Sequence, residues 1–332
     1  MLPVTSAATL VRFLLLVALV LAAAAVSLLY GSSGLGPADA LAALGGGGDE
    51  TARSIVLDVR LPRTLAAVGV GSVLALAGVL LQALFRNPLA DPYVLGVSGG
   101  AAVGALAALM AGAGAVATRS GAFAGAIATI ALVAVIGRGG GMTRLLLSGV
   151  VLASACGAGV AVLLALADSG QLRGMVFWLA GDLGWAQDPW TSTLAALAAL
   201  ALALAFARPL NVLAAGERRA QAVGLDLGLA RWAIFLVSAA LTSTAVVTAG
   251  TIGFVGLVTP HAVRLAFRTG DHRIVAPAAA LAGGGFVTLA DYAARTIAAP
   301  RQLPVGAILA LIGAPLFLVL LRSAVSAPRA RQ

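Results

Sequence analysis

The sequence predicts an all-α, polytopic membrane protein with about ten transmembrane helices, because of its composition and its succession of apolar runs. The chain is 61% hydrophobic and 10% charged, with a mean hydropathy of +1.05. Soluble globular domains do not have this composition. One span takes about 20 apolar residues, so a length of 332 residues leaves room for roughly ten spans. We therefore expect residues 1–332 to form a single transmembrane domain.

Apolar runs divide the first half of the chain into five expected spans. The first run follows Arg12 and extends for about 20 residues, so we interpret it as a retained anchor and not as a signal peptide. The second run begins after two arginines and ends in a turn with Pro88 and Pro92. A glycine-rich run follows, and then two longer runs separated by a triple glycine. These spans are expected near residues 10–30, 62–84, 91–112, 118–137 and 143–167.

The second half of the chain supplies the other five expected spans. A polar segment at 208–230 separates the sixth span from the seventh. The eighth is short for a full crossing, and the ninth ends near Arg295. These spans are expected near residues 190–207, 231–250, 254–267, 274–295 and 305–322.

Residues with small or short side chains indicate how the spans pack and turn. Gly96, Gly100 and Gly104 recur every four residues, a spacing that lets helix backbones approach closely in a membrane. Asn87 and Asp91 flank the proline turn, where short polar side chains stabilise turns and helix caps.

The arginines indicate the orientation of the chain. Ten crossings place both termini on one side, and if that side is cytoplasmic it holds fourteen of the 21 arginines against seven opposite. This distribution satisfies the positive-inside rule. We therefore expect a multi-pass protein of the bacterial cytoplasmic (inner) membrane with both termini cytoplasmic. Topology also explains the net charge of +9 better than binding of nucleic acid does, because the arginines are scattered among apolar spans.

Missing residue types exclude several kinds of chemistry. The chain has no lysine, so it has neither a phosphate-loop lysine nor a Schiff-base lysine, and any ATP must be used by a partner. Cys156 is the only cysteine, and the two histidines are too few for a histidine-built metal centre. Asp291 is the one carboxylate in the interior of an expected span, since Asp91 only begins one, and Arg295, four residues later, would neutralise Asp291. We expect no cofactor, no metal and no catalytic role.

Three blocks of the sequence resemble one known family. They are RLPRTLAAVGVGSVLALAGVLLQALFRNPLADPYVLGVSGGAAVG at 60–104, GTIGFVGLVTPHAVRL at 250–265 and LPVGAILALIGAPLFL at 303–318. Over nearly its whole length the chain resembles FecCD-type permeases, the transmembrane subunits of ABC importers for ferric siderophores, haem and cobalamin. The resemblance implies a pore made with a second permease copy, as a homodimer or a heterodimer. It also implies ATP-binding cassette ATPase subunits and an extracytoplasmic substrate-binding protein as partners.

Arg60, Arg63 and Arg295 form the first candidate site. Arg60 and Arg63 share one helix face, and Pro62 between them suits a first helical turn. In the family, arginines matching these three positions receive acidic residues of the substrate-binding protein, and guanidinium groups suit that task. We expect them to form exposed charge pairs with that partner. The alternative is that they snorkel to water and anchor helix ends.

The polar segment 208–230 is the second candidate site. Its mixture of apolar and charged residues, with glycines that permit sharp changes of direction, predicts two short helices with a bend that could lie in a groove of a soluble partner. In the family the corresponding loop is the coupling element seated on the ATPase subunit, and a plain solvated connector is the alternative. The residues expected to carry the coupling are Gly216, Glu217, Arg218, Arg219, Ala220, Val223 and Gly224.

Met142 and Thr143 form the third candidate site, a cytoplasmic gate. They follow the triple glycine at 139–141, which suits a hinge. By resemblance, this helix start lies near the cytoplasmic end of the translocation path. Family members often have small hydroxyl residues there, and Met142 departs from that pattern. A flexible surface loop is the alternative.

Taken together, these residues favour an importer permease that moves an iron chelate, haem or cobalamin with ATP hydrolysed by a separate subunit. The alternative is an ion-coupled secondary transporter. Such a transporter generally needs ionisable groups within the membrane, and Asp291, which is expected to pair with Arg295, is poorly suited to that role. A membrane-embedded enzyme lacks a nucleophile or metal constellation. The sequence does not name the cargo, because the expected pore wall is mostly Ala, Gly, Val and Leu.

Overall fold

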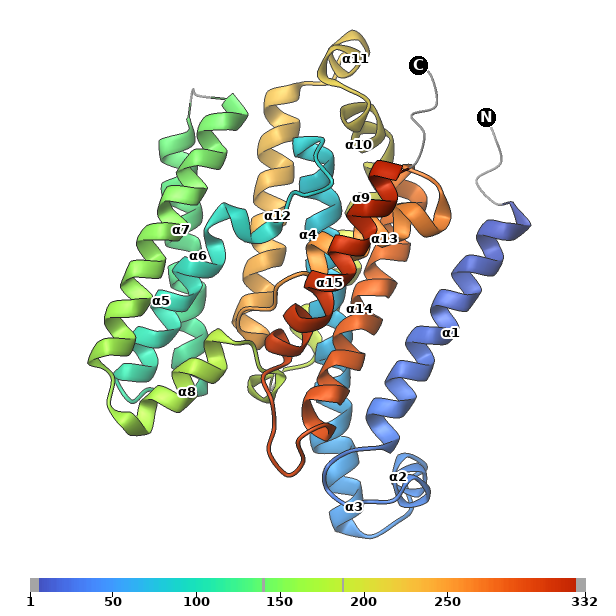
Figure 1. Cartoon of the computed structure of the whole chain (residues 1–332), viewed down its shortest axis with the longest axis vertical. Helices are drawn as coiled ribbons and strands as arrows, with labels where there is room; N and C mark the ends of the chain where they lie inside the picture. Colours follow the sequence, from blue (N-terminus) through green and yellow to red (C-terminus); the bar gives the residue numbers. More distant parts are fainter. Residues whose placement is uncertain (1–5, 139–140, 187, 327–332) are drawn as a thin grey trace.

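The computed structural model describes residues 6–138, 141–186 and 188–326. Within these ranges the chain forms helices joined by turns and short loops, without a β-strand (Figure 1). The elements are α1 (Ala7–Leu29), α2 (Pro37–Leu44), α3 (Glu50–Ser54), η1 (Ile55–Arg60), α4 (Leu61–Phe85), η2 (Pro92–Leu95), α5 (Val97–Met110), α6 (Ala115–Gly137), α7 (Gly141–Leu166), α8 (Ser169–Leu179), η3 (Leu183–Trp185), α9 (Trp190–Ala205), α10 (Ala207–Ala214), α11 (Glu217–Ala222), α12 (Leu227–Ala249), α13 (Val255–Phe267), α14 (His272–Thr296) and α15 (Val305–Ser326).

The expected spans coincide with helices, so the prediction of an all-α polytopic fold is confirmed. Six helices are long and apolar enough to cross a bilayer: α1, the continuous helix Glu50–Phe85, α6, α7, α12 and α14. The pair α9 and α10, bent by 68°, is a seventh if it counts as one span. Three shorter apolar helices, α5, α13 and the Val305–Leu320 part of α15, account for the remaining predicted spans.

The second expected span differs most from its prediction. Pro62 is the second residue of α4, as predicted, but α4 continues α3 and η1, so the helix runs unbroken from Glu50 to Phe85. The preceding turn, η1, is a π-helix in which the N–H of Leu61 donates to the carbonyl of Val56. A widened turn of this kind accommodates the proline ring and its missing N–H without ending the helix.

Helix α4 is the centre of the bundle. Every residue from Gly69 to Leu84 is buried, and α9, α12, α13 and α14 pack around it. Helix α14 approaches α4 closely, because a Cβ atom built on Gly71 would overlap the backbone of Gly283, and the reverse also holds. In a membrane, where lipid is as apolar as the helices, such close backbone packing supplies the dispersion energy that holds spans together.

The glycines of α5 serve the predicted purpose. A Cβ atom on Gly100 would overlap Thr129 and the carbonyl of Gly125, and one on Gly104 would overlap the carbonyl of Gly121. Helices α5 and α6 therefore pack backbone to backbone, with α7 against α5.

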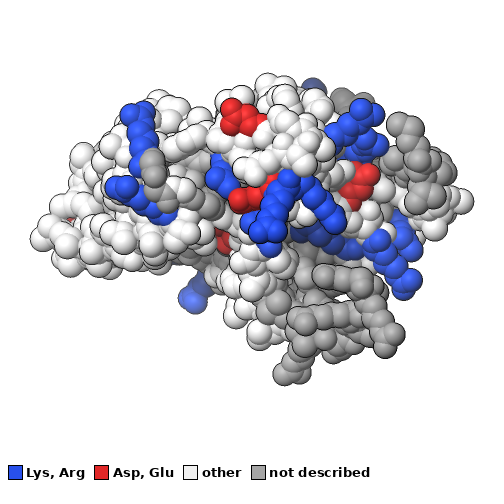
Figure 2. Space-filling model, turned by 90° about the horizontal axis from the view of Figure 1, so that it is seen from above, with Lys and Arg blue, Asp and Glu red and all other residues white. Residues whose placement is uncertain are grey.

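The bundle has two ends of different character. The end that carries α10, α11 and the start of α14 is called the α11 end, and the end that carries α2, α3 and the close of α14 is called the α3 end (Figure 1). Helix α1 begins and α15 finishes at the α11 end, as an even number of crossings requires. Figure 2 looks onto the α11 end, where basic side chains outnumber acidic ones.

Candidate coupling and docking sites

The segment 208–230 folds as predicted into two short helices with a bend. Helices α10 and α11 meet at Gly216, whose φ of +126° is accessible to glycine and strained for other residues. Gly224, with φ +79°, follows α11. Asp226 then caps α12 by accepting the N–H of Leu229 at 3.0 Å. The loop is thus a defined projection at the α11 end.

The predicted coupling residues face in two directions. Arg218 and Arg219 are exposed, and Val223 is 69% exposed. Ala220, between them in sequence, is completely buried. One face of α11 therefore offers two positive charges and an apolar side chain to an outside partner, while the other packs on the protein.

Glu217 ties the start of α11 to two spans. Its Oε1 lies 3.3 Å from Nη2 of Arg86, at the C-cap of α4, and 2.8 Å from Nη2 of Arg231 in α12. The side chains of Arg86, Glu217 and Arg231 are 46%, 39% and 28% exposed. Exposed ion pairs are worth about 0.2–1 kcal/mol each, so these bonds orient α11 more than they stabilise the fold.

Sequence reasoning misses Asn211, which bonds α10 to the start of α14. Its Nδ2 donates to Oδ1 of Asp271 at 2.7 Å. Its Oδ1 accepts the N–H of His272 at 2.9 Å and lies 2.6 Å from Nδ1 of the same residue. Since Oδ1 can only accept, Nδ1 is assigned the proton. No local pattern marks Asn211, because its partners lie about sixty residues further along the chain.

Asp271 caps α14 and stays ionised. Partial burial opposes ionisation, but hydrogen bonds from the Arg273 N–H, at 3.0 Å, and from Asn211 outweigh it, and the charge of Arg273 adds to them. The pKa of the Asp271 carboxyl therefore lies below its ordinary value. A negative charge at this helix N-terminus also complements the helix dipole.

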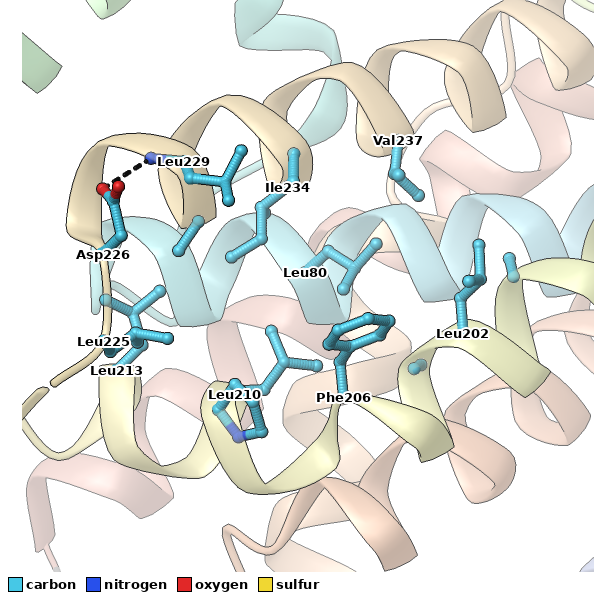
Figure 3. Close-up of a pocket in the computed structure, with 15 residues that line it drawn as sticks. Leu80, Leu202, Phe206, Leu210, Leu213, Leu225, Asp226, Leu229, Ile234 and Val237 are labelled. Atoms are coloured by element: carbon cyan, nitrogen blue, oxygen red, sulfur yellow. Dashed lines mark hydrogen bonds between the residues drawn. The ribbon is translucent and has the colours of Figure 1, made fainter. Parts of the chain in front are cut away.

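An apolar cavity of about 490 Å³ lies between α10 and α12. Its walls come from α4, α9, α10 and α12, with Leu210 and Ile234 on opposite sides (Figure 3). Asp226 is the one charged residue in the wall, and its carboxylate is engaged with the N–H of Leu229. Helix α10 packs chiefly against α4, α9, α11 and α14.

The three predicted docking arginines are not exposed, so that part of the prediction is wrong. Arg60 is 4% and Arg295 is 9% exposed, and the Arg63 side chain is 11% exposed. Each finds hydrogen-bond acceptors within the chain. The physical reason is that these guanidinium groups lie where α1, α4 and α14 converge, and a buried charge must be paired or hydrogen-bonded.

Asp291 holds two of these arginines. The carboxylate is completely buried. Its Oδ1 lies 2.9 Å from Nε and 2.8 Å from Nη2 of Arg63, and its Oδ2 accepts from Nε of Arg295 at 2.9 Å. The predicted pair between Asp291 and Arg295 is confirmed. Arg295 Nη2 also donates to Oγ of Ser27 at 2.8 Å, and that hydroxyl lies 2.8 Å from Oγ1 of Thr64.

A second carboxylate, Asp182 of the loop between α8 and α9, completes the cluster. Its Oδ1 lies 3.5 Å from Nη2 of Arg63 and accepts from Nε2 of Gln302 at 2.9 Å. The two positive charges of Arg63 and Arg295 are therefore balanced by the two negative charges of Asp182 and Asp291 at the α3 end.

Arg60 does not take part in these ion pairs. Its Nη1 donates to the carbonyls of Leu28 and Leu29 at 2.8 and 3.0 Å, and its Nη2 donates to Oγ of Ser33 at 2.8 Å. In the described part of the chain no carboxylate forms an ion pair with Arg60. Its positive charge is thus solvated by neutral oxygens and remains uncompensated.

The predicted gate lies at the start of α7. Gly139 and Gly140 are outside the described residues, and α7 begins at Gly141, whose φ is +68°. Met142 and Thr143 are in the first turn, where Thr143 is exposed. Over the described ranges, no group of three or more His, Cys, Asp or Glu is arranged to hold a metal ion.

Comparison with known proteins gives one family. The FecCD transport family matches residues 15–323. A cobalamin import permease, BtuC of Halobacterium salinarum, is 44% identical over 82% of this chain and 74% of its own length. A hemin transport permease, HmuU of Yersinia pestis, is 42% identical over 80% of this chain and 83% of its own. The vitamin B12 import permease BtuC of Salmonella typhi is 42% identical over 95% of this chain and 96% of its own.

A solved structure has the same fold. It is a metal-chelate type ABC transporter in an inward-facing conformation, with a TM-score of 0.82 and 31% sequence identity. The match covers 94% of this chain and 99% of that one.

Proposed function

This chain belongs to the FecCD transport family, and we propose that it is the permease subunit of an ABC importer that carries an iron chelate, haem or cobalamin across the cytoplasmic membrane. The observation that carries the proposal is the family match over residues 15–323. Relatives named for cobalamin and for hemin are 44% and 42% identical, so identity does not choose between these cargoes. The chain is non-catalytic and forms the translocation path with a second permease copy.

ATP hydrolysis belongs to a partner in this proposal. The chain has no lysine and therefore no phosphate-loop lysine. We propose that the ATPase subunits bind the exposed face of α11, where Arg218, Arg219 and Val223 lie, and that Met142 and Thr143 form the gate at the same end.

The test is uptake by the permease reconstituted in vesicles with its ATPase and binding protein. Uptake of the chelate should continue when an ionophore collapses the proton gradient and should stop when ATP is removed. The permease alone should hydrolyse no ATP. Uptake that follows the proton gradient without ATP would instead establish an ion-coupled secondary transporter.

We propose that the binding protein docks at the α3 end, near Arg60, Arg63 and Arg295. Arg60 supports this proposal most, because its charge has no carboxylate partner in the described part of the chain. An acidic side chain of the binding protein would supply one once the contacts of Arg60 with Leu28, Leu29 and Ser33, which leave it 4% exposed, have opened. Arg60→Gln should weaken binding of the binding protein, and the difference from wild type should shrink as salt screens the charge. Equal affinities at low salt would leave Arg60 as a helix anchor only.

A further inference from the structure

Helix α14 is bonded at both ends to the sites described above. Its first residue, His272, is held by Asn211 of α10, and near its other end Asp291 and Arg295 are held together with Arg63 of α4. The helix has 25 residues, which gives a length of about 38 Å at 1.5 Å per residue. One helix thus joins the predicted coupling loop to the predicted docking arginines.

Both of these contacts use buried side chains. His272 is 2% exposed, and Asp291 is completely buried. The ion pairs of Glu217, which connect α11 to α4 and α12, are between 28% and 46% exposed, so water and salt weaken them. A displacement of α10 is therefore passed to α14 more firmly than a displacement of α11 is passed to α4 or α12.

The cavity beside α10 favours the same route. Across it, α10 and α12 face each other, with Leu210 and Ile234 on opposite walls (Figure 3). Helix α10 has fewer contacts with α12 than with α4, α9, α11 or α14, so α12 resists its movement less than those helices do. Helix α14 and α4 do pack against α10.

Helix α14 is continuous, so a displacement at its first turn can be transmitted to its last turn. Pro277 removes one backbone hydrogen bond near its start, yet the helix continues without a break to Thr296. Near mid-length the backbone of Gly283 lies against that of Gly71 in α4. This contact restrains α14 from bending away from α4.

We propose that Asn211 and Asp291 are positioning residues of one link, through which α14 couples the ATPase at the α11 end to the docked binding protein at the α3 end. The inference rests on the proposed function and adds to it the helix and the two side chains that transmit the signal. Arg63 and Arg295 keep a small exposed surface, 11% of the Arg63 side chain and 9% of Arg295, through which an acidic group of the binding protein would compete with Asp291 for the same guanidinium donors. Docking therefore loosens α14 at one end and shifts its contact with Asn211 at the other.

The test uses the importer assembled from permease and ATPase in lipid nanodiscs. The ATPase rate is measured with and without saturating cognate binding protein, for wild type, Asn211→Ala, Asp291→Asn and the double variant. Each single variant should lower the stimulation, measured as the ratio of the stimulated to the basal rate of the same variant, by about fivefold or more, the low end of ordinary allosteric couplings. The double variant should be no worse than either single one, because both changes break one link, whereas independent effects would multiply.

Binding supplies a second readout. Because coupling is reciprocal, the change in binding-protein affinity caused by ATP should shrink by the same factor in the variants. Matched controls are Asn87→Ala and Asp188→Asn, exposed residues at the α11 and α3 ends whose side chains cap local turns. They should keep wild-type stimulation.

The outcomes separate the inference from the proposed function. The proposed function itself would be overturned if the wild-type permease bound no ATPase, or if the ATPase rate did not change when the binding protein was added. Wild-type stimulation in Asn211→Ala, or losses that multiply in the double variant, would overturn the link alone. Asn211 is only partly buried, so its variant decides the question even where Asp291→Asn does not assemble.

Discussion

Asp291 shows how a single carboxylate can organise one end of the molecule. Each of its two oxygens accepts from a different guanidinium group, those of Arg63 and Arg295. Removing the carboxylate leaves two nearly buried cations without this counterion. Asp188 at the same end is a useful contrast, because it is exposed and, among the described residues, accepts hydrogen bonds from its neighbours Trp190 and Thr191.

At this scale we expect Asp291→Ala to lower the free energy of unfolding by about 3–5 kcal/mol, the usual cost of breaking a buried ion pair. Asp188→Ala should cost about 0.5–1.5 kcal/mol, the net contribution of an ordinary hydrogen bond. Chemical unfolding of the detergent-solubilised permease measures both. Equal losses in the two variants would show that Asp291 is not a buried counterion.

At the scale of single elements, α11 offers a surface to a partner, whereas the contact between α4 and α14 holds the bundle together. Arg218 and Arg219 project from α11 without an ion pair in the described part of the chain, so they are available to a partner. The contact between α4 and α14 depends on Gly71 and Gly283, which have no side chains to hold the backbones apart.

The double variant Arg218→Glu, Arg219→Glu should assemble poorly with the ATPase while inserting normally into the membrane, because it reverses two charges on the proposed coupling face. Co-purification of permease and ATPase measures assembly. Arg138→Glu with Arg144→Glu makes the same charge change at exposed residues of the same end and serves as the control. Normal assembly of the first variant would return residues 208–230 to the role of a plain connector.

Gly283→Ala should lower the free energy of unfolding by about 1–3 kcal/mol, because its Cβ atom would overlap the backbone of Gly71. Gly174→Ala, inside α8, meets no atom within 4 Å. That control should be neutral or stabilising by about 0.5–1 kcal/mol, since alanine favours a helix over glycine. A loss of stability in Gly283→Ala without a loss in Gly174→Ala is the expected result, and a neutral Gly283→Ala would contradict the packing.

At the scale of the whole molecule, the orientation in the membrane is the property to test. We expect both termini in the cytoplasm, as the distribution of arginines predicts. A fluorescent protein fused to the C-terminus should fold and fluoresce. In a Cys156→Ser background, Arg301→Cys, an exposed position at the α3 end, should react with an impermeant maleimide from outside. Labelling from inside only would invert the topology.

The sequence by itself determined the helices, the approximate spans and the bend within segment 208–230. In lipid a backbone must satisfy its own hydrogen bonds, so an apolar run of sufficient length becomes a helix whatever surrounds it. Gly216 marked the bend for an equally local reason, because few residues other than glycine adopt its φ of +126°. Both features depend on at most about twenty consecutive residues, so they can be predicted from local sequence.

Only the tertiary structure decided which polar groups meet. Arg63 and Asp291 are 228 residues apart, and Asn211 and His272 are 61 apart. Their contacts depend on how α14 lies against α4 and α10, and hydropathy carries no record of that arrangement. The burial of Arg60, Arg63 and Arg295 was missed for the same reason: a charged residue at the end of a span is exposed or buried according to what packs over it.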